Sequence, residues 1–168
     1  SNLLNKENAL LKQKDVLQVQ PIVFKKKNLI EDFSKIHNTD IIHECLNFLP
    51  SEIKFNFLSH LNSNILYPLN MFIAKKDLFN EYCKILFPWM EQCMELFLKK
   101  NILVSYNTRL PAFLAERFTS FWFSQNLNRS NLSYARLGKF FLSNKVNRFI
   151  NPIKLPFTSK MYPTLHKY

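Results

Sequence analysis

The sequence contains one glycine, Gly138, among its 168 residues. Phosphate-binding loops of the P-loop and dinucleotide-binding types need several closely spaced glycines, because their backbone must approach the phosphate oxygens closely. A single glycine cannot build either loop. The composition therefore excludes both glycine-rich motifs.

Cysteine is also scarce, and Cys45, Cys83 and Cys93 form no CxxC pair. Their odd number argues against a disulfide framework, and their spacing argues against a zinc site. No stretch approaches the ~20 apolar residues that span a bilayer, and we expect no signal peptide. These features predict a cytoplasmic protein with reduced, mostly buried thiols.

Acidic residues are missing from the last part of the chain, where no Asp or Glu follows Glu116. The same part carries nine cations: Arg117, Arg129, Arg136, Lys139, Lys145, Arg148, Lys154, Lys160 and Lys167. Together with the formal net charge of +11, this one-signed tail favours an anionic membrane surface or a polyanion as a partner. A solvated tail with no specific partner is the alternative.

What the sequence does contain is typical of a globular protein, with 47% hydrophobic and 21% charged residues. Such a balance is unlike that of a disordered chain, and the length suits one domain with its own core. We expect an α/β domain rich in helix over residues 1–125, followed by a basic tail with Phe and Pro over residues 126–168.

Hydrophobic periodicity and turn residues predict the order of the elements. Helices are expected at 29–37, 41–49, 51–61, 76–99, 111–125 and 140–150, and strands at 15–20, 22–24, 65–73, 102–104 and 132–135. Pro88 predicts a kink or break near 84–87 in the long fourth helix. The helix at 111–125 is apolar on most of its surface, so it should be largely buried.

Glu116 is an acid on this largely apolar helix, and a buried carboxylate must be paired, hydrogen-bonded or protonated. Arg109 and Arg117 are the nearby candidate partners. One interpretation is a Glu–Arg pair that only fixes the helix against a loop. The other is a carboxylate at a functional site, acting as a general base or binding a hydroxyl group.

Three blocks of sequence resemble a known family. Residues 70–76 read NMFIAKK, residues 79–87 read FNEYCKILF, and residues 109–118 read RLPAFLAERF. These blocks resemble the NMFI(M)KK, F-x-E-Y-C-x-x-L-F and R-x-x-G-F-L-x-E-R-L motifs of bacterial capsular-polysaccharide and lipopolysaccharide glycosyltransferases, a family long catalogued as a domain of unknown function. Ala112 stands where the family has Gly.

The resemblance covers residues 15–123 and implies a GT-A-like α/β fold. The family's N-terminal half, with its first nucleotide-binding strands and its His-Tyr-Arg-Arg signature, has no counterpart in this sequence. We therefore expect the chain to be the C-terminal part of such an enzyme, or a diverged partial domain.

The function that the resemblance implies is transfer of a sugar from a nucleotide sugar to a lipid-linked or oligosaccharide acceptor of capsule or lipopolysaccharide. Glu116 would be the acceptor base, Arg109 and Arg117 would bind phosphate or orient Glu116, and Asn70 would contact sugar or acceptor. His37 and Asp40 match the family's H…D-L spacing and join the candidate substrate-binding residues. The enzyme would work at the cytoplasmic face of the inner membrane, held there by the basic tail.

No D-x-D motif is present, so the sequence does not support a divalent metal cofactor, and a helix-capping role is the alternative for His37 beside Asp40. The aromatic residues Phe55, Phe57, Phe72, Phe79, Phe87, Trp89 and Trp122 fall mostly on helical stripes, which predicts core positions rather than a sugar-stacking surface. Two other functions stay open: a nucleic-acid-binding module, disfavoured because no recognition motif is present, and a non-catalytic scaffold domain of a larger polysaccharide-assembly protein.

Overall fold

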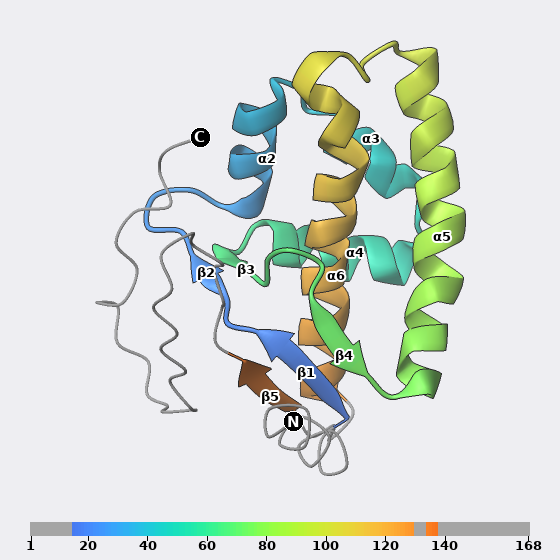
Figure 1. The fold of residues 1–168 in the computed structure, drawn as a ribbon. Coiled ribbons are helices and arrows are strands. Elements are labelled where there is room, and N and C mark those ends of the chain that lie inside the picture. The colour runs from blue at the N-terminus through green and yellow to red at the C-terminus, as the bar shows by residue number, and fades with distance from the viewer. Residues whose placement is uncertain (1–14, 130–133, 138–168) are drawn as a thin grey trace, which may run out of the picture.

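The computed structural model describes residues 15–129 and 134–137. It has the predicted helix-rich α/β architecture (Figure 1). The helices are α2 (Leu29–His37), α3 (Ile42–Cys45), α4 (Ser51–Leu61), α5 (Lys76–Lys99) and α6 (Leu110–Arg129), with 3-10 helices η1 (Leu46–Phe48) and η2 (Ser105–Arg109). The strands are β1 (Val16–Val19), β2 (Ile22–Val23), β3 (Ile65–Leu66), β4 (Phe72–Ala74) and β5 (Tyr134–Leu137).

Helix α6 is the centre of the fold, with α2, α4 and α5 packed around it (Figure 1). Leu114 and Phe118 are fully buried on α6, and the Phe118 ring packs against the rings of Phe57 on α4 and Trp89 on α5. Each large apolar side chain buried in this way stabilises the fold by about 1.5–3 kcal/mol. The predicted burial of this helix is confirmed.

Two small sheets lie beside the helices. Strand β1 is the middle strand of the larger one, antiparallel to β4 and parallel to β5. Leu17 stands opposite Ile73 of β4 and Ala135 of β5. The second sheet pairs β2 with β3, so that Ile22 lies opposite Leu66. Strands β1 and β2 thereby fix the two ends of the loop between β3 and β4.

Helix α2 has the predicted bounds because both ends carry specific caps. The Asn28 side chain accepts from the backbone N–H of Glu31, and the Glu31 carboxylate accepts from the backbone N–H of Asn28. This capping box satisfies two of the otherwise free amides at the helix start. Asn38 ends the helix in the left-handed conformation (φ 50°), which asparagine tolerates better than most residues.

The apolar segment 65–73 was predicted as one strand, and this prediction is wrong. Strand β3 ends at Leu66 and β4 begins at Phe72, with a loop between them. Pro68 has no N–H for a ladder, and Leu69 and Asn70 both have positive φ, at 73° and 50°. The predicted strand at 102–104 is absent too, because that segment is a connection from α5 to η2.

Helix α5 is continuous through Pro88, so of the predicted kink or break the break is absent (Figure 1). Proline removes one backbone bond, but Pro88 lies on the exposed side of the helix. On the opposite side, Leu86, Trp89 and Cys93 are buried in the core and keep both halves of the helix in place. Packing therefore outweighs the local cost of about 3 kcal/mol.

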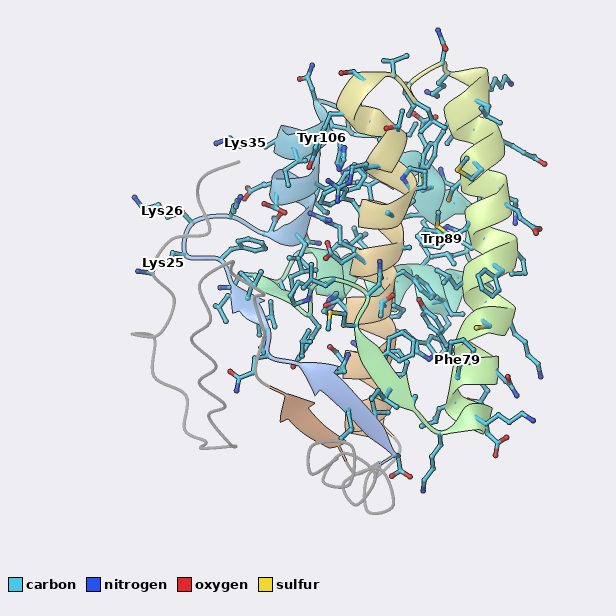
Figure 2. All side chains as sticks on the ribbon, in the orientation of Figure 1. Lys25, Lys26, Lys35, Phe79, Trp89 and Tyr106 are labelled. Carbon is cyan, nitrogen blue, oxygen red and sulfur yellow. The ribbon has the colours of Figure 1, made fainter. Side chains whose placement is uncertain are left out.

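The prediction that the aromatic residues form the core holds for Phe57 and Trp89, which are buried, and Phe72 and Trp122 pack against the core. It is wrong for Phe55, Phe79 and Phe87, which are 74%, 43% and 58% exposed. Helical spacing places residues on a face but does not show how far that face is covered. Figure 2 shows Phe79 near the start of α5 and Trp89 beside its middle, on the side of α6.

Two of the elements predicted in the C-terminal part of the chain lie within the described residues. Helix α6 continues past the predicted end at 125 to Arg129, and the strand predicted at 132–135 is β5, at Tyr134–Leu137. The helix predicted at 140–150 and the rest of the basic tail lie outside the described residues. In the described part of the chain, no helix is both long and apolar enough to cross a membrane.

Candidate functional site

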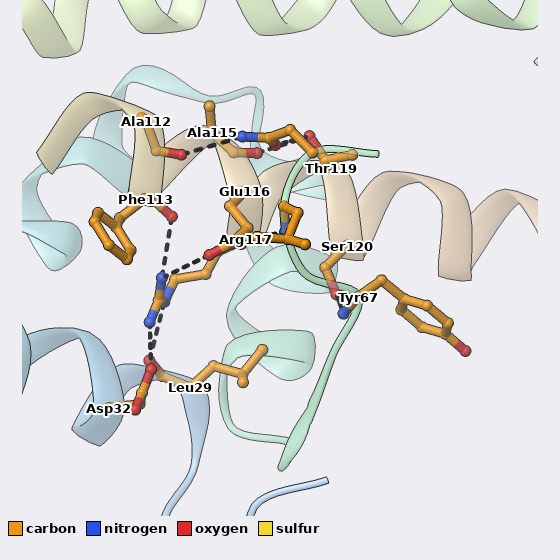
Figure 3. A network of polar contacts seen from close by, with 12 residues as sticks. Leu29, Asp32, Tyr67, Ala112, Phe113, Ala115, Glu116, Arg117, Thr119 and Ser120 are labelled. Carbon is orange, nitrogen blue, oxygen red and sulfur yellow. Dashed lines mark hydrogen bonds and ion pairs between the residues drawn. The ribbon is translucent and has the colours of Figure 1, made fainter. Parts of the chain in front are cut away.

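Glu116 lies on the middle turns of α6, facing the loop between β3 and β4 (Figure 3). Its side chain is 12% exposed. One carboxylate oxygen, Oε1, accepts a hydrogen bond from the backbone N–H of Leu69, and the other, Oε2, lies 3.8 Å from Nη1 of Arg117. The acid is therefore mostly buried and hydrogen-bonded, as its position on an apolar helix predicts.

Asn70, the first residue of the NMFIAKK block, is held against α6 beside Glu116. Its Nδ2 donates to the carbonyl of Ala112 at 3.3 Å, and its Oδ1 accepts from Thr119 at 2.8 Å. The neighbouring Leu69 has a left-handed backbone conformation, which costs roughly 1–2 kcal/mol and must be offset by other contacts of the loop. The bonds to Ala112, Glu116 and Thr119 fix this loop along two turns of α6.

Tyr82, from the FNEYCKILF block, extends the network. Its hydroxyl lies 2.7 Å from Oγ1 of Thr119, which has Asn70 Oδ1 and the Ala115 carbonyl, each at 2.8 Å, as acceptors for its one proton. Burial raises the pKa of Tyr82, and the hydrogen bond to Thr119 opposes the shift. The three sequence blocks therefore converge on one polar network against α6.

Arg117 points to the other side of α6 and is completely buried. Its Nη2 donates to Asp32 Oδ2 at 2.6 Å, its Nη1 to the Phe113 carbonyl at 3.1 Å, and its Nε to the Leu29 carbonyl at 3.4 Å (Figure 3). Burial lowers the pKa of Arg117, while Asp32 and Glu116 oppose the shift. The guanidinium is inaccessible and Asp32 balances its charge, so Arg117 cannot bind a phosphate. Of the two roles expected for Arg117, orientation of Glu116 is the one that this position allows.

Arg109 is the last residue of η2, exposed just before α6 begins, and lies apart from Glu116. Its guanidinium carbon lies 5.5 Å from the ring centre of Phe113 and 5.9 Å from that of Tyr106. A guanidinium over aromatic rings is held in place yet open to a ligand. Of the two arginines, Arg109 is the one that a phosphate can reach.

His37 and Asp40 do not form a pair. Asp40 is exposed, whereas His37 is buried and lies 2.9 Å, measured from its Nδ1, from Oδ1 of Asn107. The Phe33, Phe113 and Tyr106 rings surround the imidazole, with ring centres 4.7, 4.9 and 6.0 Å away. His37 therefore belongs to the same cluster as Arg109, Tyr106 and Phe113. Asp40 belongs neither to this cluster nor to the network around Glu116.

Sequence reasoning missed Asp32, Thr119 and the pair of His60 and Ser120. The Ser120 hydroxyl oxygen lies 3.0 Å from Nε2 of His60 and accepts from the backbone N–H of Tyr67 at 3.0 Å. Asp32 carried a usable signal, because it falls with Leu29 and Phe33 on the buried face of α2. Over the residues that the structure describes, no three His, Cys, Asp or Glu side chains are grouped as a metal site would require.

Comparison with known families gives one match. Residues 2–127, most of the chain, match the family described as a domain of unknown function (DUF4422). The matched region includes Asn70, Tyr82 and Glu116, and all three sequence blocks. The comparisons with curated proteins and with solved structures gave no significant match.

Proposed function

The chain belongs to the DUF4422 family, and we propose that it takes part in sugar transfer from a nucleotide-sugar donor to a capsule or lipopolysaccharide acceptor. The observation that carries the proposal is the convergence of the three blocks. Asn70, Tyr82 and Thr119 form one chain of hydrogen bonds, and Glu116 holds the same loop one turn away on α6.

In this proposal Glu116 takes the proton of the attacking acceptor hydroxyl. An ionised carboxylate has about four lone-pair positions, and the backbone N–H of Leu69 is one of the groups that bind to them. Arg117 lies on the opposite side of the carboxylate and restricts its orientation. Asn70 stands where it can contact the acceptor, and the exposed Arg109 is the cation available to a diphosphate.

Glu116→Gln is the direct test. The side-chain carbonyl of the introduced glutamine can still accept from Leu69, so the loop should stay attached, but an amide cannot remove a proton at neutral pH. We expect sugar transfer to fall about 10²–10⁴-fold, the usual contribution of a general base. Release of nucleoside diphosphate from a panel of nucleotide sugars, with capsule and lipopolysaccharide acceptors, measures the effect.

Glu95→Gln on the exposed surface of α5 makes the same chemical change away from the network and should leave transfer unchanged. Thermal unfolding of both variants is measured in parallel. A Glu116→Gln protein with wild-type transfer would contradict the proposal. A variant that fails to fold would show that the carboxylate serves to fix α6 against the loop.

A further inference from the structure

His37 carries an unusual atom at the end of α2. Its side chain is 2% exposed, and its Nε2 is buried without a hydrogen-bond partner among the residues that the structure describes. A buried polar atom of this kind has lost its water and gained nothing in return, which is rare in folded proteins. Such an atom calls for an explanation.

The neighbouring hydrogen bonds fix which ring nitrogen carries the proton. Asn107 donates through Nδ2 to the His37 carbonyl at 3.1 Å, so that Oδ1 is the atom facing the imidazole Nδ1. Oδ1 can only accept, and therefore Nδ1 carries the hydrogen. Burial lowers the pKa of His37, with the Asn107 bond opposing. Nε2 is consequently a bare acceptor on a neutral ring, suited to an O–H or N–H donor.

The groups around this acceptor have two further properties. The Tyr106 ring is 49% exposed and stacks on the imidazole with an angle of 23° between the planes. The exposed guanidinium of Arg109 lies over Tyr106 and Phe113. Figure 2 shows Tyr106 at the end of the molecule where Lys35 also projects, from the last turn of α2.

We propose that η2 and the end of α2 form a nucleotide subsite, in which Tyr106 stacks on the base, Arg109 binds the phosphates and His37 Nε2 accepts a hydrogen bond from the nucleoside. An aromatic face, an exposed guanidinium and a neutral acceptor match the base, the diphosphate and the donor groups of a nucleoside diphosphate. Nε2 is sealed in this structure, so η2 must shift away from α2 when the nucleotide binds. The subsite rests on the proposed function for its choice of ligand.

Direct binding of UDP and GDP to the full chain, measured by isothermal titration calorimetry, tests the subsite. We expect Tyr106→Ala and Arg109→Gln each to raise the Kd at least tenfold. Both side chains are exposed, so the fold should survive. The matched controls are Phe87→Ala and Lys84→Gln, an exposed aromatic and an exposed cation on α5, and these should leave the Kd unchanged.

The second readout is the ¹⁵N resonance of His37 Nε2, which should move upfield at saturating nucleotide as the bare nitrogen accepts a hydrogen bond. Uridine and inorganic pyrophosphate are titrated separately. Pyrophosphate binding as tightly as UDP would reduce the site to a simple anion site and overturn the proposal. Absent binding, an unmoved Nε2 resonance, or Kd values unaffected by Tyr106→Ala and Arg109→Gln would overturn it as well.

These outcomes are separable from the fate of the proposed function. Glu116→Gln should bind UDP or GDP as the wild type does. If nucleotide binding depends on Tyr106 and Arg109 but no sugar is transferred, the subsite stands and the transferase proposal falls. If sugar transfer persists with an unchanged KM in both subsite variants, the transferase proposal stands and the subsite falls.

Discussion

Asp32→Ala is expected to destabilise the protein by about 3–5 kcal/mol, the usual cost of removing one partner of a buried ion pair. Among the residues that the structure describes, the variant leaves the fully buried Arg117 with one ion-pair partner, Glu116, at 3.8 Å. Its guanidinium cannot reach water without unpacking α6 from α2. The carbonyls of Leu29 and Phe113 still accept from Nε and Nη1, but they do not balance its charge, and Nη2 loses its acceptor.

Arg117→Met should cost less than Asp32→Ala, although it removes the larger side chain. Asp32 keeps a second cation, Lys27, at 2.5 Å, and methionine retains much of the apolar stem of arginine. The double variant should be more stable than Asp32→Ala alone, because the fully buried guanidinium that has lost Asp32 is removed as well. Urea unfolding at pH 7, followed by circular dichroism, gives the three free energies.

The surface pair of Glu44 and Lys100 provides the control. Its N–O distance is 2.7 Å, close to the 2.6 Å of the buried pair, but the side chains are 48% and 41% exposed. Glu44→Ala should therefore change the free energy of unfolding by less than about 1 kcal/mol. If Asp32→Ala had no larger effect than Glu44→Ala, burial would not be the factor that makes the Asp32–Arg117 pair important.

Local signals in the sequence were enough to predict most helices between residues 29 and 129, although the helix expected at 41–49 is divided into α3 (Ile42–Cys45) and η1 (Leu46–Phe48). The bounds of α2 follow from its capping residues, and the length of α5 follows from an apolar stripe sustained along the whole helix. The segment 65–73 failed because its apolar residues serve two short strands and a loop that crosses α6. What fixes that loop is the acceptor on Glu116, which lies 47 positions away from Leu69.

The contact of Glu116 with Arg117 was a stated candidate, but the other pairings of the site were not predictable from the sequence. Glu116 was recognisable as an acid on an apolar helix, and Asp32 fits the same description. Yet Asp32 and Arg117 are 85 positions apart, and His37 and Asn107 are 70 apart. Periodicity places each residue on a face of its own element. Which two faces meet is decided by the packing of whole helices. This is why periodicity could not decide between the two expected roles of Arg117, phosphate binding and orientation of Glu116.

Acidification from pH 7 to pH 4 is expected to remove about 3 kcal/mol of stability through His60 alone. Burial lowers the pKa of His60 from 6.5 to about 4 in the folded protein. Between these two values the unfolded chain binds a proton that the folded protein does not, so the free energy of unfolding falls as the pH falls. Above pH 6.5 neither state is protonated and the effect is absent; below pH 4 it is complete. His37, whose pKa is also lowered, adds a loss of the same sign.

His60→Gln isolates this contribution, because glutamine can keep a hydrogen bond to the Ser120 hydroxyl and does not titrate in this range. The free energies of unfolding of wild type and variant are measured in urea at several pH values. Between pH 7 and pH 4 the wild type should lose about 3 kcal/mol more than the variant. His43→Gln, at an exposed position on α3, should follow the wild type. A constant difference between wild type and His60→Gln would mean that His60 is protonated in the folded protein as readily as in the unfolded chain, and that its contact with Ser120 is open to water.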